Sequence, residues 1–492
     1  MSLVYLIAWV LPVLAGIGAY QALDRVLDTN APSPGSRSAA VGYGIVLGLL
    51  LVSASTALMA HADTAHAWVH AAPLLLFVTL VAAALVYWRR RSGVTVAFVA
   101  SVEKISPWKW IALLAMLASL LLRGAIAARE IWLRPTYPWD AWSAWAVKAK
   151  AWFLLGRYVP YVSMHDWMLR PNADLYTAVA WHYPDALAWI EVWFASAAGG
   201  WIEPLVNLPW LAVWIALLFA HYGQWRVLGL SQVRALFFVY VLGSLPLLTV
   251  HTAIAGYADL WVAALFAFAV LAWMRWLQRR ERGQLLLALL CAAVLPALKL
   301  EGLVWAVCLF AAIAFSALPP RWRWRCVAFI AVACIILFVF GGLHFLFALI
   351  GWIDASGAIV LPSVGPLALV FSPTWHGDAA VGIARTLFAQ PNWHLLWWIT
   401  PVVLVWRWRE LVAHDWLWLP GLLLLVCVAL LLFLFLFTDA GKWAASFTAI
   451  NRLVLQITPA VVTLLAMLLR EAHLAQASID TASGSDLRND PG

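Results

Sequence analysis

The stretch Tyr137-Pro-Trp-Asp-Ala-Trp-Ser-Ala-Trp-Ala-Val-Lys-Ala-Lys-Ala-Trp-Phe153 decides how the rest of the chain is arranged. It follows the strongly apolar residues 109–131 and cannot be one plain membrane span, so we expect it to lie just outside the bilayer. From Asp140 onward it predicts a helix lying in the membrane interface, where Lys148 and Lys150 can reach lipid phosphates. The apolar side chains of that helix are Trp142, Trp145, Val147, Trp152 and Phe153.

Asp140 falls in the first turn of this predicted helix. A carboxylate is favoured there by the helix dipole and can cap the free N–H groups. We therefore expect an acid at membrane level, beside a place where lipid phosphates can dock. The alternative is that Asp140 is only a helix cap and the tryptophans only an interfacial belt.

The composition indicates a polytopic α-helical membrane protein, with 65% hydrophobic residues, 11% charged residues and a mean hydropathy of +0.89. The net charge of +8 comes from Arg and Lys that gather in alternate loops, so no nucleic-acid partner is needed. The cysteines lie in or near apolar runs without CxxC spacing, which indicates neither a disulfide scaffold nor a metal site. They are Cys291, Cys308, Cys326, Cys334 and Cys427.

About thirteen membrane spans can be drawn, each near the twenty residues that a bilayer requires, some shorter. Most of the Arg and Lys residues fall in loops on one side, which we take as cytoplasmic. The N-terminus is then outside and the C-terminal tail inside. The predicted spans are 2–20, 40–60, 67–88, 109–131, 204–222, 233–250, 259–277, 284–299, 302–318, 327–349, 392–406, 416–437 and 452–469.

Residues 184–200 decide whether this topology holds. The stretch is apolar but short and contains acidic residues; if it crossed the bilayer, every later basic loop would move outside. We therefore expect a second external interfacial helix, within one long outer loop at 132–203. A second outer loop is expected at 350–391, and a disordered cytoplasmic tail at 471–492.

Charged residues that are costly in a bilayer gather on the predicted outer face. Asp259 lies at the outer end of a span, and Lys299 and Glu301 lie in a very short hairpin. Arg452 lies near the last outer loop. Together with Asp140 these side chains predict a polar cavity open to the outside. Taken singly they have simpler explanations, since Lys299 and Glu301 can pair with each other and Arg452 can extend to the interface.

Several short motifs, taken in order and with their shared sidedness, resemble the membrane glycosyltransferases of the GT-C class. The nearest branch is the bacterial one akin to protein O-mannosyltransferases and aminoarabinose transferases. The resemblance covers roughly residues 105–470, expected to form a GT-C module, and leaves residues 1–104 as a three-span N-terminal extension. The motifs are Trp139-Asp-Ala-Trp142, His182-Tyr-Pro184, Gly256-Tyr-Ala-Asp259, Lys299-Leu-Glu-Gly302 and Arg452.

The resemblance implies an inverting transfer of a sugar from a polyprenyl phosphate carrier, with Asp140 as the general base that deprotonates the acceptor hydroxyl. Lys299, Arg452 and Lys148 would bind the donor phosphate. It further implies a bacterial inner (cytoplasmic) membrane protein whose active site faces the periplasm. The expected substrate-binding residues are His182, Tyr257, Asp259, Glu301, Trp139 and Trp142.

The sequence departs from its relatives beside the predicted base. Protein O-mannosyltransferases carry an Asp-Glu pair, whereas Ala141 follows Asp140 here. A metal held by paired acids is therefore not favoured, although Asp259 or Asp166 can supply a second ligand, and no cofactor is expected. No large soluble outer domain is present to recognise a polypeptide, which favours a lipid-linked glycan or a lipid as acceptor.

The main alternative is a transporter or flippase for a lipid-linked sugar, which would usually show related halves and broken spans. A third reading is an O-antigen ligase-like enzyme with a diphosphate-linked donor. His61-Ala-Asp63 with His66 and His70 has a spacing that can bind a metal, but such histidines are more often interfacial. His165-Asp166 is either an acid–base pair or an ordinary surface pair.

Overall fold

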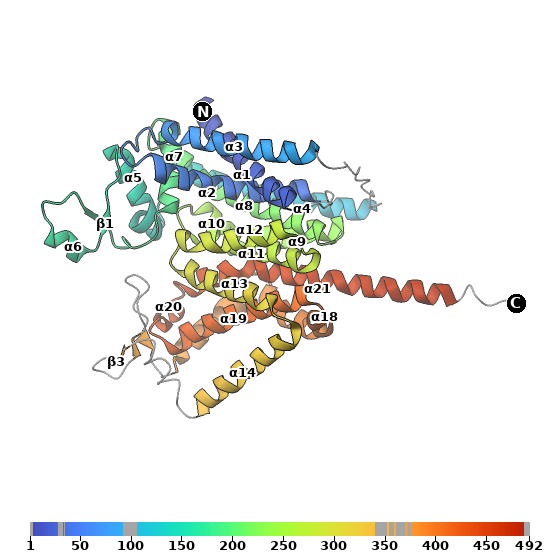
Figure 1. Ribbon diagram of the computed structural model, residues 1–492. Helices are drawn as coiled ribbons and strands as arrows, with labels where there is room; N and C mark the ends of the chain where they lie inside the picture. Colours follow the sequence, from blue (N-terminus) through green and yellow to red (C-terminus); the bar gives the residue numbers. More distant parts are fainter. Residues whose placement is uncertain are drawn as a thin grey trace.

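A computed structural model gives the fold and describes residues 3–27, 33, 35–91, 106–339, 352–353, 359–360, 370–371 and 375–486. For residues 471–486 it describes the path of the backbone. Most of the long helices run along one common axis, with α14 and α19 inclined to it (Figure 1).

Eight helices of the described part are long and apolar enough to cross a membrane, with 21 to 27 residues in each apolar stretch. At 1.5 Å per residue these lengths match a hydrocarbon core of about 30 Å. The prediction of an all-α polytopic membrane protein is confirmed at this level. The helices are α1 (Leu3–Val26), α2 (Ser36–Met59), α3 (Ala67–Arg91), α4 (Pro107–Leu133), α8 (Glu203–Val227), α11 (Asp259–Arg279), α19 (Asp415–Phe437) and α21 (Ile450–Asp486).

Other predicted spans are shorter or broken. The span at 233–250 is a bent pair, α9 (Gln232–Gly243) and α10 (Pro246–Ala253), with 62° between the two helices. Pro246 begins α10, and its missing N–H prevents one straight helix through the break. The count of thirteen spans stays a prediction. The remaining apolar helices are α12 (Arg282–Leu298), α13 (Glu301–Ala317), α14 (Pro320–Val339) and α17 (Leu396–Trp406).

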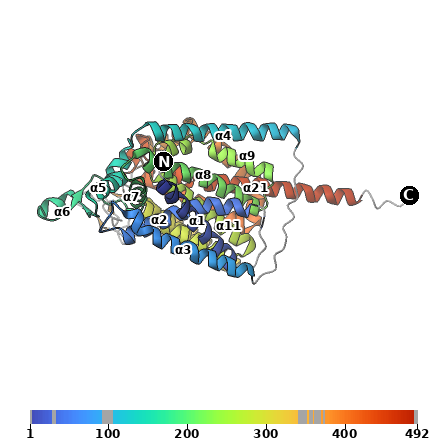
Figure 2. The same ribbon diagram turned by 90° about the horizontal axis from the view of Figure 1, so that it is seen from above.

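The segment between α4 and α8 lies at one end of the bundle, which we name the loop end. The end of α21 lies at the opposite end, as Figures 1 and 2 both show. The loop-end elements are the π-helix η1 (Ala141–Trp145), α5 (Ala146–Leu155), α6 (Met164–Leu169) and α7 (Ala186–Ala198), with β1 (Tyr161–Val162) paired in parallel to β2 (Tyr176–Thr177).

Helix α7 differs from the interfacial helix expected at 184–200. Its 13 residues are too few to cross the bilayer, yet it does not lie on the surface. Every side chain from Leu187 to Ala197 is buried, and the helix packs against α1, α2, α3, α5 and α8. Apart from Glu191 and Ser196, which are buried with it, the helix is apolar on all sides, and a helix of this kind is covered on all sides. The protein interior, rather than lipid, supplies that cover.

The N-terminal helices are joined to the rest of the bundle by one continuous apolar core. The Tyr5 hydroxyl donates to the Leu205 carbonyl at 2.7 Å, and the Tyr43 hydroxyl donates to the Phe268 carbonyl at 2.8 Å. A side chain at Gly16 would collide with the backbone of α2, which shows how closely α1 and α2 approach. Helices α1 and α2 therefore pack directly on the rest of the described bundle.

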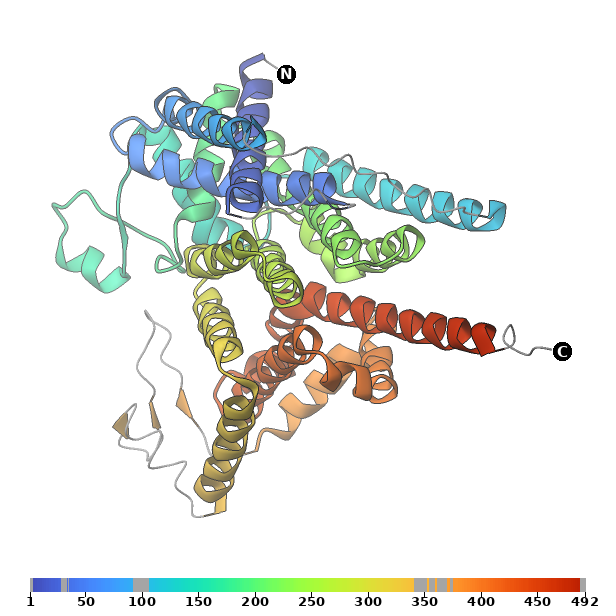
Figure 3. The same cartoon turned by 45° about the vertical axis from the view of Figure 1, so that its right-hand side comes forward.

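The C-terminal part contains short elements between its long helices. Helix α21 continues to Asp486 (Figure 3), so residues 471–486 of the tail expected to be disordered extend the helix that carries the last span. Of the expected loop 350–391, the structure describes three short strands and residues 375–391. The elements are β3 (Trp352–Ile353), β4 (Ile359–Val360) and β5 (Val370–Phe371) in antiparallel order, α16 (Gly377–Ala384), the π-helix η2 (Arg385–Ala389), α18 (Trp408–Ala413) and α20 (Gly441–Ala445).

Candidate functional site

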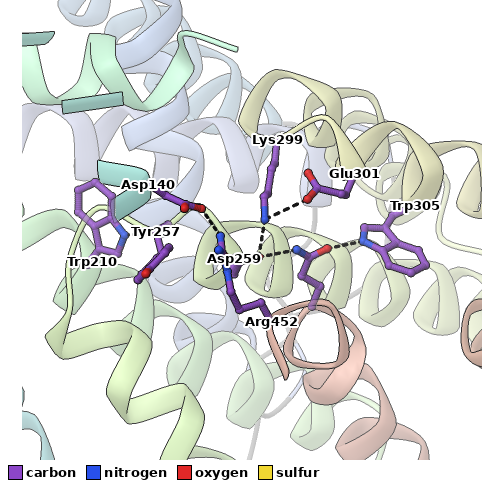
Figure 4. A network of polar contacts seen from close by, with 9 residues as sticks. Asp140, Trp210, Tyr257, Asp259, Lys299, Glu301, Trp305 and Arg452 are labelled. Carbon is purple, nitrogen blue, oxygen red and sulfur yellow. Dashed lines mark hydrogen bonds and ion pairs between the residues drawn. The ribbon is translucent and has the colours of Figure 1, made fainter. Parts of the chain in front are cut away.

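Four segments that are far apart in the chain meet at the loop end and join their charged side chains (Figure 4). Asp140 directly precedes η1, and Asp259 is the first residue of α11. Lys299 ends α12, and Arg452 lies in the first turn of α21. The fold thus brings together residues that the sequence placed in separate loops.

Arg452 is shared between two carboxylates. Its Nε donates to Asp259 Oδ2 at 2.8 Å, and its Nη2 lies 2.8 Å from the same oxygen. Nη2 also donates to Asp140 Oδ2. The Asp140 carboxylate makes no capping hydrogen bond to η1, so the structure replaces the expected helix cap with an ion pair. Arg452 therefore links the loop containing Asp140 to α11 and α21.

Asp259 is the centre of this network. Its side chain is fully buried, and Oδ1 accepts hydrogen bonds from Lys299 Nζ at 2.8 Å and from Gln456 Nε2 at 2.6 Å. The N-terminal position in α11 also favours a negative charge. Gln456 is held in turn by Trp305, whose indole N–H donates to Gln456 Oε1 at 2.5 Å. These donors satisfy the lone pairs of the buried carboxylate.

Glu301 closes the network on the side of Lys299. Its Oε1 lies 3.2 Å from Lys299 Nζ, as the simple pairing explanation expected, but Oε2 is buried and finds no partner among the described residues. The side chains of Asp140, Arg452 and Glu301 keep 19%, 21% and 27% exposure, whereas Asp259 and Lys299 are closed off. The accessible edge of the cluster thus carries two acids and one guanidinium.

Aromatic residues hold the cluster in place. The Arg452 guanidinium lies 4.4 Å from the centre of the Tyr257 ring, a cation–π arrangement. The indole N–H of Trp210 donates to the Tyr257 carbonyl at 2.7 Å. Gly256 has φ of 109° and packs so closely on Ala141 that a side chain at this position would collide with it. The turn before α11 therefore requires glycine and sets the distance between α11 and η1.

Comparison of the chain with protein-family models, with curated proteins and with solved structures finds no match.

His182 and Tyr183 approach the cluster from the loop before α7. Their rings are stacked with centroids 5.0 Å apart. Burial lowers the pKa of His182, and the nearby Lys148 lowers it further, while Glu301 acts in the opposite direction. Burial raises the pKa of Tyr183, and Glu301 adds to the effect. His182 Nδ1 is buried without a partner among the described residues, so this ring edge can still accept or donate a hydrogen bond.

Lys148 was expected to bind the donor phosphate, but the structure buries it and pairs it with Asp185. Its Nζ donates to Asp185 Oδ1 and to the Tyr183 carbonyl, both at 2.7 Å, and its side chain is only 2% exposed. Burial lowers its pKa, and the Asp185 carboxylate opposes that effect. Lys148 thus fastens the His182 loop to α5, and we leave it out of the group that can meet a lipid phosphate.

The tryptophans of the organising stretch divide into two sets. Trp145 and Trp152 are fully buried, whereas Trp139 and Trp142 are about half exposed and meet edge to face with ring centres 4.5 Å apart. Only the second pair remains available to a substrate or to lipid. The expected interfacial helix is therefore covered on one face by α7 and the loop around Tyr158.

Metal binding has no support among the described residues, where no group of three or more His, Cys, Asp or Glu side chains is placed to hold an ion. The positive charge that lies between Asp140 and Asp259 is that of the Arg452 guanidinium. Asp63 is hydrogen-bonded to both His66 and His70 at 3.1 Å. In the His165-Asp166 pair, the Asp166 carboxylate accepts a hydrogen bond from the Ser163 hydroxyl, and Ser163 also caps α6.

Gln456 was not among the predicted site residues, and Tyr183 entered only as the middle residue of the His182-Tyr-Pro184 motif. Gln456 follows Arg452 by four residues in α21, and this spacing puts both side chains on one helix face. The signal was therefore present as a polar pair within an otherwise apolar span. The motif gave Tyr183 no role of its own, because the charged groups around it come from other segments of the chain.

Proposed function

We propose that the chain is a membrane glycosyltransferase that moves a sugar from a polyprenyl-phosphate carrier to a lipid-linked glycan or lipid acceptor. The observation that supports it best is the pairing of Asp140 with Arg452, an acid and a phosphate-binding group held in contact at the mouth of a helix bundle. Transfer from a lipid phosphate requires these two functions within one reaction centre.

In this proposal Asp140 is the general base. The acceptor hydroxyl loses its proton to the carboxylate as its oxygen attacks C1 of the sugar, and the C1–O bond to the lipid phosphate breaks. The anomeric centre is inverted because attack and departure take place on opposite faces. The leaving phosphate gains negative charge, which the partly exposed Arg452 stabilises by direct contact and the buried Lys299 by its charge at longer range.

The contacts of Arg452 also give a reason why the donor should bind before the acceptor hydroxyl loses its proton. Before the donor binds, its guanidinium is shared between Asp140 and Asp259. An arriving phosphate competes for the same N–H groups and draws Arg452 away from Asp140. Asp140 Oδ2 is then free to accept the proton of the acceptor hydroxyl, so proton transfer follows donor binding.

Glu301, His182 and Tyr257 would then contact the sugar. Glu301 Oε2 and His182 Nδ1 are two buried polar atoms near the cluster that have no partner among the described residues. We place the site on the periplasmic face of a bacterial inner membrane, because arginines lie at the opposite end of the bundle, in the last turns of α3 and α8 (Figure 1).

The test is transfer from radiolabelled polyprenyl-phosphate sugars by purified protein in liposomes that contain extracted envelope glycolipids. Wild type should transfer, and Asp140→Asn should lose about 10²–10⁴-fold in rate. Asp166→Asn is the matched control, an aspartate of the same loop that only bonds to Ser163. Equal activity of Asp140→Asn and wild type would refute the assignment of the base.

A flippase for the same lipid-linked sugar is the second candidate. The bent pair α9 and α10 favours it, because transporters carry discontinuous helices near their substrate sites. In the same liposomes a flippase would move labelled lipid between leaflets without forming a new glycoside.

A further inference from the structure

A hollow lies between α5 and the start of α8, on the side of η1 that faces away from the Asp140–Arg452 pair. Its volume is about 260 Å³, below the roughly 300–1,000 Å³ of sites for drug-sized ligands, and it fits one small cyclic unit. Side chains two positions apart on a helix do not face each other, so Trp142 turns into this hollow while Asp140 turns to Arg452. The lining side chains used below are Trp142, Lys150, Trp201, Glu203 and Thr136.

Two indoles give the hollow its apolar surface. Trp142 is 47% exposed, and its ring N–H already donates to the Tyr137 carbonyl at 3.2 Å. Its orientation is therefore fixed, while about half of the side chain stays exposed. Trp201 comes from the turn before α8, and Lys150 Nζ lies 5.9 Å from its ring centre. Flat aromatic faces of this kind are suited to the C–H face of a pyranose ring.

A matched pair of opposite charges supplies the polar rim. Lys150 Nζ lies 3.4 Å from Glu203 Oε1. The other carboxylate oxygen, Oε2, accepts the Thr136 backbone N–H at 2.7 Å, and the Thr136 hydroxyl is itself held by Asn207. The carboxylate is thus fixed before any ligand arrives, and Lys150 retains donors for a further partner.

The opposite charges of Lys150 and Glu203 indicate which class of ligand the hollow can bind. A phosphate drawn to Lys150 would meet Glu203 within about a hydrogen-bond length, and an ammonium drawn to Glu203 would meet Lys150. A neutral polyhydroxyl group can use both, donating to the carboxylate and accepting from the ammonium. This argument disfavours an anionic lipid headgroup and favours a sugar.

We propose that this hollow, the Trp142 pocket, binds a neutral sugar unit of the acceptor glycan next to the one that reacts. The proposal rests on the proposed function, because it is the transferase reaction that gives the chain an acceptor. A glycan that wraps around the η1 turn presents its reacting hydroxyl to Asp140 and its neighbouring sugar to Trp142.

The test is saturation-transfer NMR on the full chain in phosphatidylglycerol nanodiscs. The probes are methyl α-D-glucoside and methyl α-D-mannoside, with phosphoethanolamine and inorganic phosphate as the headgroup alternatives. We expect a methyl glycoside to bind, and Trp142→Ala to weaken it at least about fivefold, as loss of one aromatic stack predicts. Trp142→Phe should retain most of the binding, which separates loss of the ring from misfolding.

The matched control is Trp167→Ala, a similarly exposed tryptophan of α6 outside the pocket, and its binding should equal that of wild type. Binding of phosphoethanolamine or phosphate in place of the glycosides would overturn the proposal, as would unchanged glycoside binding by Trp142→Ala.

Transfer assays with the same variants separate this proposal from the proposed function. If sugar transfer takes place but Trp142→Ala leaves the acceptor KM unchanged, the function stands and the pocket proposal is wrong. If no transfer is found while glycoside binding depends on Trp142, the pocket stands and the proposed function is wrong.

Discussion

Replacing Asp259 by asparagine tests how much the buried charge network contributes to stability. The asparagine has the same size but no charge, so Lys299 loses its nearest carboxylate and Arg452 keeps only Asp140. The Asp259 and Lys299 side chains are almost completely buried. Removing one partner of a buried ion pair costs about 3–5 kcal/mol, which corresponds to roughly 10²–10⁴ in the unfolding equilibrium constant.

The assay is unfolding of the purified protein in mixed micelles with increasing SDS, followed by circular dichroism. A double-mutant cycle with Lys299→Gln isolates the pair, and the double variant should be less destabilised than the sum of the single variants by about 0.5–3 kcal/mol. The matched control is Asp174→Asn, whose exposed partner is Arg157 and whose cost should be within about 1 kcal/mol. A cost below about 1 kcal/mol for Asp259→Asn, or strict additivity in the cycle, would refute the central role of Asp259.

Three other predictions follow from the same contacts. Lys148→Met should destabilise the protein by roughly 1.5–3 kcal/mol by leaving Asp185 unpaired, whereas Lys150→Met should change the unfolding midpoint little. Burial holds the pKa of His182 below the usual 6.5. Wild type should therefore lose stability as pH falls below 6.5, because the unfolded chain takes up the proton first. The curve of stability against pH should be flatter for His182→Gln, and parallel curves for the two proteins would contradict this prediction. Asp140→Asn should bind the polyprenyl-phosphate donor at least as tightly as wild type, because Arg452 is released, and weaker donor binding would argue against competition for Arg452.

The sequence was sufficient for the class of fold and for several members of the candidate site. Length and apolarity of segments such as α11 and α19 depend on local composition, so a bilayer-length helix can be predicted without knowing its neighbours. The cost of charge at membrane level singled out Asp259, Lys299 and Arg452 for the same reason. The structure joins all of these through hydrogen bonds that the sequence did not specify.

What could not be predicted depends on which face of a helix is covered. An amphipathic helix in the membrane interface and a helix covered by other helices have similar sequences, as Trp145 and Trp152 show. The depth of α7 depends on its contacts with α1, α2 and α3, whose positions are set by distant parts of the chain. Lys148 was placed at a lipid surface because its partner Asp185 lies 37 residues away, beyond the reach of any helical spacing rule.

The two aspartates that share Arg452 differ in burial, and this difference assigns them different duties. Asp259 is fully buried and accepts from both Lys299 and Gln456, so it keeps its place whether or not Arg452 turns away. Asp140 is partly exposed and has Arg452 as its one side-chain ion partner among the described residues. In the proposed reaction, a phosphate that attracts the guanidinium should break the contact to Asp140 first, because two N–H groups of Arg452 contact the buried Asp259 Oδ2 and only one contacts Asp140. Arg452 would then bind the phosphate while the carboxylate beside it accepts the proton.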